Sequence, residues 1–253
     1  MAFQAEMTHK FVSPPAQFPI LDRRNVHVWM IDLKQKSPIV GELFLQLSED
    51  EQARANRFIF DRDRHRFIET RWSLRYLLSK YIHKPANKIE IANGHKGKPY
   101  IIQDNTPTQV KFNVSHSGAA AIIAFCLGDE IGIDIEKIRP EVATEEIARR
   151  HFSKCELDEL SQLPPDQQTI GFFRCWTRKE AYLKAIGIGL GIDLRSFDVS
   201  LGAGDTADLR TADGHKWKLI PFSAEPDYIG ALVCSRDKQS IQYLLFDYLL
   251  KSL

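Results

Sequence analysis

The sequence EIGIDIEKIRP, residues 130–140, is the clearest structural pattern in this 253-residue chain. Three isoleucines occupy every second position and alternate with Gly132, Asp134 and Glu136. Successive side chains of a β-strand point to opposite faces, so the two carboxylates share one face, roughly 6.5 to 7 Å apart. The pattern predicts a strand with an aliphatic face and an acidic face. A half-exposed strand with no ligand shows the same alternation, so both interpretations stay open here.

Regular elements are expected upstream of this stretch. Residues 26–33 suit a strand, and Ser48 with Glu51 forms a capping box at the start of a helix. Helical periodicity runs from 66 to 82 and ends before Pro85. Residues 110–117, 119–125 and 130–136 are expected to form three strands of one antiparallel sheet.

The downstream part repeats the mixture of helix and strand. Ser153 and Glu156 form a second capping box, and a long helix over residues 167–186 ends at the C-cap candidate Gly187. Four strand-like runs follow. The order of elements predicts an α+β protein in two similarly sized halves. We expect a lead-in over 1–25, an N-terminal half over 26–136, a linker over 137–145 and a C-terminal half over 146–253.

Bulk composition restricts the function classes. The formal net charge of +1 gives no global field toward nucleic acid or an anionic membrane, so neither is an expected partner. The four cysteines form no CxxC pair, which favours reduced thiols and a cytoplasmic protein. The N-terminus lacks the apolar core of a signal peptide, and the longest apolar run, 119–127, is too short to span a bilayer.

The segment WTRKEAYLK, residues 176–184, places an acid and a base on one helix face. Trp176, Glu180 and Lys184 follow one another at intervals of four residues. Together the last two side chains can serve a metal and an anion. The alternative is an exposed ion pair worth about 0.3 to 0.5 kcal/mol.

Three other segments offer groups for an anion. FNVSHSG, residues 112–118, sets His116 between two serines, which suits phosphate or ribose, although a polar turn has the same letters. GHKGKP, residues 94–99, combines two glycines with two lysines but lacks the spacing of a Walker A loop. An arginine-rich run over 54–71 is expected to be mostly solvated or paired with acids, with one or two members able to reach a phosphate.

The order of these motifs is more specific than any one of them. GKP, FNVSHS, GIDIE and WTRKEAYLK followed by GIGL resemble the 4′-phosphopantetheinyl transferases of the Sfp type, from about the first strand to Cys234. The resemblance implies a pseudo-dimer of two similar α+β halves with the active site in the cleft between them. It implies magnesium-dependent transfer of the 4′-phosphopantetheine arm of coenzyme A to a serine of an apo acyl or peptidyl carrier protein. Adenosine 3′,5′-bisphosphate would be released.

The resemblance also assigns roles to residues. Asp134, Glu136 and Glu180 are expected to bind Mg²⁺, and Glu180 is also a candidate general base for the carrier serine. Lys184 is expected at the pyrophosphate of coenzyme A, and Lys179 is expected to help neutralise the site.

The phosphoadenosine end of coenzyme A is expected to meet a different set of residues. Lys98, Ser115 and His116 match the positions that hold it in the family. Arg54, and less directly Arg66, correspond to the basic residues that bind the 3′-phosphate.

Two alternatives and one partner surface remain open. A different magnesium-dependent transfer from a nucleotide diphosphate would share these acids and lysines. A non-catalytic module that binds coenzyme A or a carrier protein would not need all three acids.

The carrier is expected to come from fatty-acid, polyketide or nonribosomal-peptide biosynthesis, and the protein that modifies it is expected to be a monomer. Its docking surface is either the segment 137–152, with Lys137, Arg139, Arg149, Arg150 and Phe152, or elsewhere if that segment is an ordinary linker and helix.

Overall fold

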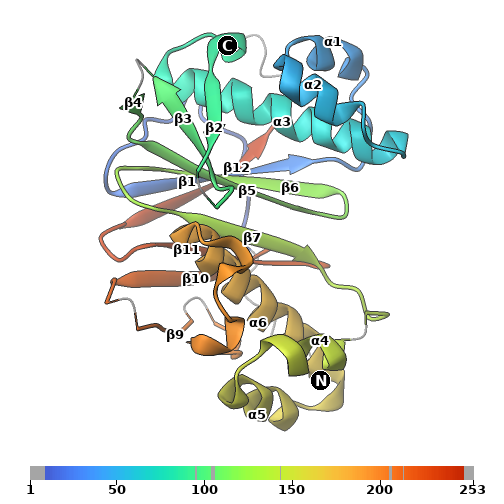
Figure 1. Ribbon diagram of the computed structural model, residues 1–253, viewed down its shortest axis with the longest axis vertical. Coiled ribbons are helices and arrows are strands. Elements are labelled where there is room, and N and C mark those ends of the chain that lie inside the picture. The colour runs from blue at the N-terminus through green and yellow to red at the C-terminus, as the bar shows by residue number, and fades with distance from the viewer. Residues whose placement is uncertain are drawn as a thin grey trace.

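Two β-sheets lie face to face in the computed structural model, and helices cover the outer face of each (Figure 1). The structure describes residues 9–94, 96–103, 106–142, 144–204, 207–212 and 214–247, with only the backbone described at Leu190. Within that part, no helix is long and apolar enough to cross a membrane.

The first sheet has the strand order β12-β1-β6-β5, with β12 parallel to β1 and the other pairs antiparallel. Its strands are β1 (Asn25–Asp32), β5 (Val110–Ser117), β6 (Ala120–Leu127) and β12 (Ser240–Phe246). The helices α1 (Val40–Leu45), α2 (Glu49–Ala55) and α3 (Asp61–Ile82) lie over it. A small sheet of β2 (Glu90–Asn93), β3 (Pro99–Gln103) and β4 (Thr106–Pro107) follows the short 3₁₀ turn η1 (Ala86–Lys88).

The second sheet has the order β10-β11-β7, and all of its pairs are antiparallel. It contains β7 (Gly132–Lys137), β10 (Trp217–Glu225) and β11 (Tyr228–Ser235). The helix α6 (Pro165–Ile186) covers its outer face, and α4 (Thr144–His151) and α5 (Lys154–Gln162) pack against α6 (Figure 1). The 3₁₀ turns η2 (Gly189–Gly191) and η3 (Leu194–Ser196) and a short pair, β8 (Asp198–Val199) and β9 (Leu209–Arg210), complete this half.

Strand alternation divides the interior into three cores. On β1, Trp29 and Ile31 pack toward the first helical layer, whereas Val28 and Met30 pack between the sheets. The isoleucines of β7 join the core between the sheets. The carboxylates of β7 therefore point the other way, toward α6.

The local predictions at helix ends are confirmed. Ser48 and Ser153 each form a complete capping box, with Glu51 and Glu156. The long helix α6 ends at Gly187, whose φ of 68° is the left-handed conformation that glycine adopts at low cost.

Strand pairing differs from the sequence-based expectation at β7. The predicted three-stranded sheet is wrong at its third member, because β7 pairs with β11 in the second sheet. The C-terminal strand β12 pairs with β1 in the first sheet, across the boundary expected at residues 137–145. Both pairings join segments distant in sequence, which local patterns do not encode. The remaining boundaries of the two halves stay predictions.

Candidate active site

A glycine on β7 brings α6 against the strand. A Cβ atom at position 132 would lie 2.0 Å from the carbonyl oxygen of Ala181 and 2.3 Å from the amide nitrogen of Ala185. Only glycine permits this approach. Because Asp134 and Glu136 share the face of Gly132, the close packing sets them beside Glu180 and Lys184 of α6.

Asp134 lies at the centre of the site and is only 4% exposed. Its Oδ1 atom accepts hydrogen bonds from Lys184 Nζ at 2.6 Å and from Ser115 Oγ at 2.8 Å. Its Oδ2 atom is buried and has no hydrogen-bond partner within the described residues. A buried carboxylate oxygen is costly to leave unpaired, so Oδ2 marks a position suited to a cationic ligand.

The neighbouring carboxylates are coupled to Asp134 by charge. Desolvation and then the charge of Asp134 raise the pKa of Glu180, and Glu136 raises it further. Desolvation also raises the pKa of Glu136, although a 2.6 Å hydrogen bond from Ser117 Oγ opposes the effect. The charge of Lys184 lowers the pKa values of both glutamates, and that of Arg139 lowers the pKa of Glu136 as well. The acidic set is therefore incompletely neutralised by the protein.

These carboxylates fit a magnesium ion whose remaining coordination positions are filled by other oxygen atoms. Among the described residues, no three side chains of His, Cys, Asp or Glu gather closely enough to form a metal cage by themselves. Mg²⁺ does not require such a cage, since it commonly takes one or two carboxylates and fills its remaining positions with water and phosphate oxygens. The unpartnered Oδ2 of Asp134 is the observation that favours this fit.

The FNVSHS motif joins the two sheets through side chains. Asn113, Ser115 and Ser117 of β5 accept hydrogen bonds from alternate backbone amides of β7, those of residues 133, 135 and 137, at 2.9, 3.4 and 3.0 Å. These amides face away from β11 and would otherwise be unpaired at a strand edge. Ser115 and Ser117 also donate to Asp134 and Glu136. The motif thus holds the acidic strand in place.

Sequence reasoning missed this role of Asn113 and Ser117. The signal was present, because polar residues at every second position of a strand lie on one face. It was not decisive, because a solvated edge shows the same pattern. The contacts of Ser115 support a positioning role, and its expected contact with coenzyme A stays a prediction.

Arg54, His116 and Lys184 are close enough to interact through their charges. His116 is exposed, and its pKa is lowered by desolvation and by the positive charges of Lys184 and Arg54. The two cations, Arg54 of α2 and Lys184 of α6, thus both act on His116 of β5 and contribute to one local positive field. An anion here would be attracted by both cations, and His116 offers it a hydrogen-bonding ring nitrogen.

The side chain of Lys98 makes its hydrogen bonds within the protein. Its ammonium donates to Glu130 Oε2 at 2.6 Å and to the carbonyl oxygens of Ile131 and Ala185 at 2.9 and 2.8 Å. These are as many bonds as three N–H groups can make. Lys98 therefore ties its loop to the start of β7 and the end of α6, and its expected contact with coenzyme A stays a prediction.

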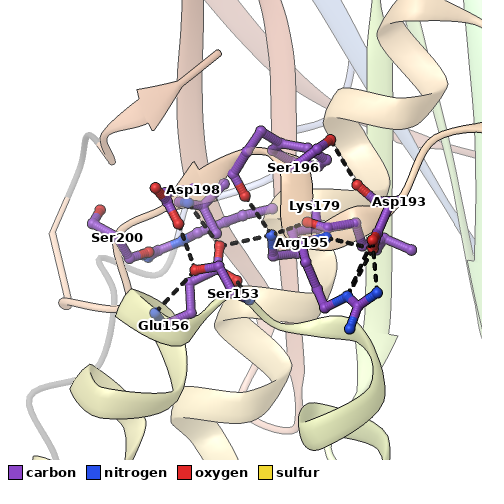
Figure 2. A network of polar contacts seen from close by, with 12 residues as sticks. Ser153, Glu156, Lys179, Asp193, Arg195, Ser196, Asp198 and Ser200 are labelled. Carbon is purple, nitrogen blue, oxygen red and sulfur yellow. Dashed lines mark hydrogen bonds and ion pairs between the residues drawn. The ribbon is translucent and has the colours of Figure 1, made fainter. Parts of the chain in front are cut away.

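Lys179 does not belong to the site, contrary to the expectation that it helps to neutralise it. Its side chain is fully buried, and Nζ lies 2.8 Å from Glu156 Oε1 and donates to the carbonyl oxygens of Leu194 and Phe197 at 2.6 and 2.8 Å. Figure 2 shows it inside a polar network with residues from α5 and from the segment after α6. On a helix, a residue directly before Glu180 points about 100° away from it.

The segment expected as a carrier surface is largely engaged elsewhere. Phe152 is 1% exposed, in the core beneath α6. Arg149 and Arg150 form ion pairs with Glu145 and Glu146 one turn earlier on α4. Phe152 is thus unavailable to a partner, and the two arginines are already partly neutralised.

Comparisons with known proteins identify the family of this chain. A family model described as 4′-phosphopantetheinyl transferase superfamily matches residues 130–233, and one described as 4′-phosphopantetheinyl transferase, N-terminal, matches residues 37–127. The chain is 34% identical to 4′-phosphopantetheinyl transferase HetI from Nostoc sp., over 89% of this chain and 94% of that protein. It is 32% identical to 4′-phosphopantetheinyl transferase Sfp from Bacillus subtilis, over 72% and 84%.

A solved structure of holo-(acyl-carrier-protein) synthase from Bacillus anthracis in complex with coenzyme A matches 42% of this chain and 93% of its own. The identity is 26% and the TM-score 0.36, too low for its geometry to be transferred. HetI, in contrast, aligns with 89% of this chain, and the two family models together match residues on both sides of the site. This chain therefore belongs to the 4′-phosphopantetheinyl transferase family.

Proposed function

We propose that this protein transfers the 4′-phosphopantetheine arm of coenzyme A to a serine of an apo acyl or peptidyl carrier protein, with Mg²⁺ as cofactor. The observation that carries the proposal is the buried Asp134, which is bonded to Lys184 through one oxygen and has no partner among the described residues at the other. A cation and an anionic oxygen of a substrate complete such an arrangement.

The residues of the site divide into two groups by charge. Asp134, Glu136 and Glu180 would hold the metal, which when bound offsets the negative charge of the pyrophosphate and stabilises the leaving phosphate. Lys184 would contact the pyrophosphate, while Arg54 and His116 would meet the phosphoadenosine end of coenzyme A.

The reaction moves the phosphopantetheine group from coenzyme A to the carrier serine. The serine oxygen of the carrier forms a bond to the phosphorus next to the pantetheine arm, and the bond from that phosphorus to the bridging oxygen breaks. Adenosine 3′,5′-bisphosphate leaves, and the serine proton passes to a base. Glu180 is the candidate base, directly or through water, because partial burial and neighbouring carboxylates increase its basicity.

Intact mass spectrometry tests the proposal. Apo carrier proteins of the fatty-acid, polyketide and nonribosomal-peptide classes are incubated with the protein, coenzyme A and Mg²⁺. At least one carrier should gain the mass of one phosphopantetheine, and a chelator or Asp134→Ala should prevent the gain. If no carrier gains mass while coenzyme A still binds by calorimetry, the protein is a binding module and the transfer proposal is wrong.

A further inference from the structure

One hydroxyl group at the end of β5 connects the backbone of the acidic strand with one of its carboxylates. Ser117 Oγ donates a hydrogen bond to Glu136 Oε2 at 2.6 Å and accepts one from the backbone amide of Lys137 at 3.0 Å. A serine hydroxyl has one donor and two acceptor sites, so it can make both bonds at once. Ser117 therefore fixes the carboxylate of Glu136 relative to the strand that carries it.

The same pair of contacts recurs two residues earlier on both strands. Ser115 Oγ donates to Asp134 Oδ1 at 2.8 Å and accepts from the amide of Ile135 at 3.4 Å. Residues two apart on a strand share a face, so the two serines of β5 match the two acids of β7 one to one. At Gly132, the preceding position on that face, there is no carboxylate, and Asn113 accepts from the next backbone amide of β7 instead. The serine hydroxyls thus coincide with the carboxylates.

Glu136 depends on Ser117 more than Asp134 depends on Ser115. Asp134 is also bonded to Lys184, at 2.6 Å. In the described part of the chain, no side chain other than Ser117 forms a hydrogen bond or an ion pair with Glu136. A free glutamate side chain populates many rotamers, and ordering it costs up to about 2 kcal/mol. Loss of the Ser117 hydroxyl would therefore add this cost to the binding of a ligand by Glu136.

The turn that follows Ser117 is fixed against the second sheet. The backbone amide of Ala119 donates to Tyr228 Oη of β11 at 2.9 Å. Gly118 has a φ of 56°, and a Cβ atom there would lie 2.7 Å from Tyr228 Oη and 3.2 Å from the Cδ atom of Lys137. Glycine at this position lets the turn approach both strands. The position of Ser117 is therefore set by β5 on one side and by the anchored turn on the other.

We propose that Ser117 is a positioning residue for the metal site: its hydroxyl holds the carboxylate of Glu136 in one orientation and leaves the second carboxylate oxygen for the ion. The inference rests on the proposed function, which assigns Glu136 to the Mg²⁺ site. The competing explanation is that Ser117 serves only the backbone, by pairing the amide of Lys137 at the edge of β7. The two explanations differ in whether the effect of Ser117 requires the Glu136 carboxylate.

Metal affinity measured without a carrier protein tests the proposal. Mn²⁺ serves as the probe, because the free ion gives an electron paramagnetic resonance signal that is lost on binding, and Mg²⁺ should displace it. The protein is titrated in the presence of coenzyme A. Ser117→Ala should raise the Kd for Mn²⁺ by about tenfold, as expected for an outer hydrogen-bond partner of a metal ligand. Ser117→Thr keeps the hydroxyl and should stay within about threefold of the wild type.

A double-mutant cycle separates the two explanations. In the Glu136→Ala background, Ser117→Ala should change the Kd for Mn²⁺ by less than about twofold, because no carboxylate is left to position. The Kd for coenzyme A, from calorimetry with a chelator present, should be the same in Ser117→Ala and the wild type. Ser79→Ala is the matched control, since the hydroxyl of Ser79 donates to the carbonyl oxygen of Tyr76 within α3, and it should change neither constant. Thermal midpoints should show that all variants are folded.

Several outcomes would overturn the positioning role. An unchanged Kd for Mn²⁺ in Ser117→Ala would show that Glu136 needs no positioning. A loss that persists in the Glu136→Ala background would assign Ser117 to the backbone alone. Equal losses in Ser117→Ala and Ser117→Thr would assign the effect to packing and not to the hydroxyl.

The same titration distinguishes this inference from the proposed reaction. Because no carrier is present, failure of the protein to modify any carrier would contradict the transfer reaction and leave the result for Ser117 standing. Absence of Mn²⁺ binding by the wild type would refute the metal assignment and the positioning role together.

Discussion

At the scale of single residues, Asp134 connects the cationic group of the site, Lys184, with the position expected for a metal ion. One carboxylate oxygen is held by Lys184 and Ser115, and the other is buried without a partner in the described structure. A structural ion pair would be expected to satisfy both oxygens, since an unpaired buried acceptor costs about 1 to 3 kcal/mol. The arrangement is explained if a bound ligand contacts the second oxygen of Asp134.

Lys184 and Glu180 should separate binding from chemistry. Lys184→Ala should weaken coenzyme A binding by about 1.5 to 3 kcal/mol, the usual scale for a hydrogen bond to a charged group. Glu180→Gln keeps the size of the side chain but removes its charge and basicity, so it should lower kcat far more than coenzyme A affinity. Calorimetry and steady-state rates measure the two effects. Normal turnover of Glu180→Gln together with normal binding by Lys184→Ala would refute both roles.

His27 makes the protein sensitive to acid. It is fully buried, its Nδ1 is hydrogen-bonded to Tyr81 Oη at 2.8 Å, and its Nε2 has no partner among the described residues. Desolvation lowers its pKa from 6.5 to about 4. The folded state therefore disfavours the protonated form, and the stability it contributes is present above pH 6.5 and lost as the pH falls toward 4.

Between pH 7 and pH 5 this single group should reduce the free energy of unfolding by about 2 kcal/mol. Urea unfolding at both pH values measures the loss. Glutamine at position 27 does not titrate but retains a hydrogen-bond acceptor. Between pH 7 and pH 5 the free energy of unfolding of His27→Gln should therefore fall by about 2 kcal/mol less than that of the wild type. Equal losses in the two proteins would show that His27 does not titrate as described.

At the scale of secondary-structure elements, the contact of β7 with α6 positions the site. Gly132→Ala would place a methyl group against the backbone at Ala181 and Ala185, where no side chain can rotate away. We expect a loss of about 1 to 3 kcal/mol in the free energy of unfolding, and a lower kcat because the carboxylates and Lys184 separate. Gly41→Ala is the control, since its added Cβ meets nothing within 4 Å. Similar behaviour of both variants would exclude a special role for position 132.

The helix α6 carries two lysines with different tasks, and a pair of variants should distinguish them. Lys179→Met leaves Glu156 buried without its cation and should cost about 3 to 5 kcal/mol of stability, with little effect on the coenzyme A affinity of the folded protein. Lys184→Ala should weaken coenzyme A binding and cost less stability than Lys179→Met, because Lys184 is 27% exposed at the site whereas Lys179 is fully buried. Denaturant unfolding and calorimetry on both variants measure this. A large loss of coenzyme A affinity in folded Lys179→Met would show that Lys179 does contribute to the site.

At the scale of the whole molecule, what the sequence predicted was mostly local. Strand alternation at residues 130–136, the two capping boxes and the C-cap at Gly187 depend on neighbouring residues, and all are present. Pairing across the molecule was not predictable in this way. Whether Lys179 or Lys184 faces the site, and which sheet contains β7, depend on contacts between segments far apart in sequence. The family resemblance identified the acids but not the side-chain ladder from β5 that holds them.

The exchange of strands between the halves should make them unfold together. β12 follows the second sheet in the chain but pairs with β1 in the first, and the core between the sheets draws on both. Opening either half would therefore expose apolar surface of the other and break the β1–β12 ladder. Hydrogen exchange in increasing urea, followed by mass spectrometry, tests this. Peptides from β1 and α3 should lose protection at the same urea concentration as peptides from β11 and α6. An earlier loss in either pair would show two separate folding units, and the site between α6 and β5 could then be disrupted without unfolding the first sheet.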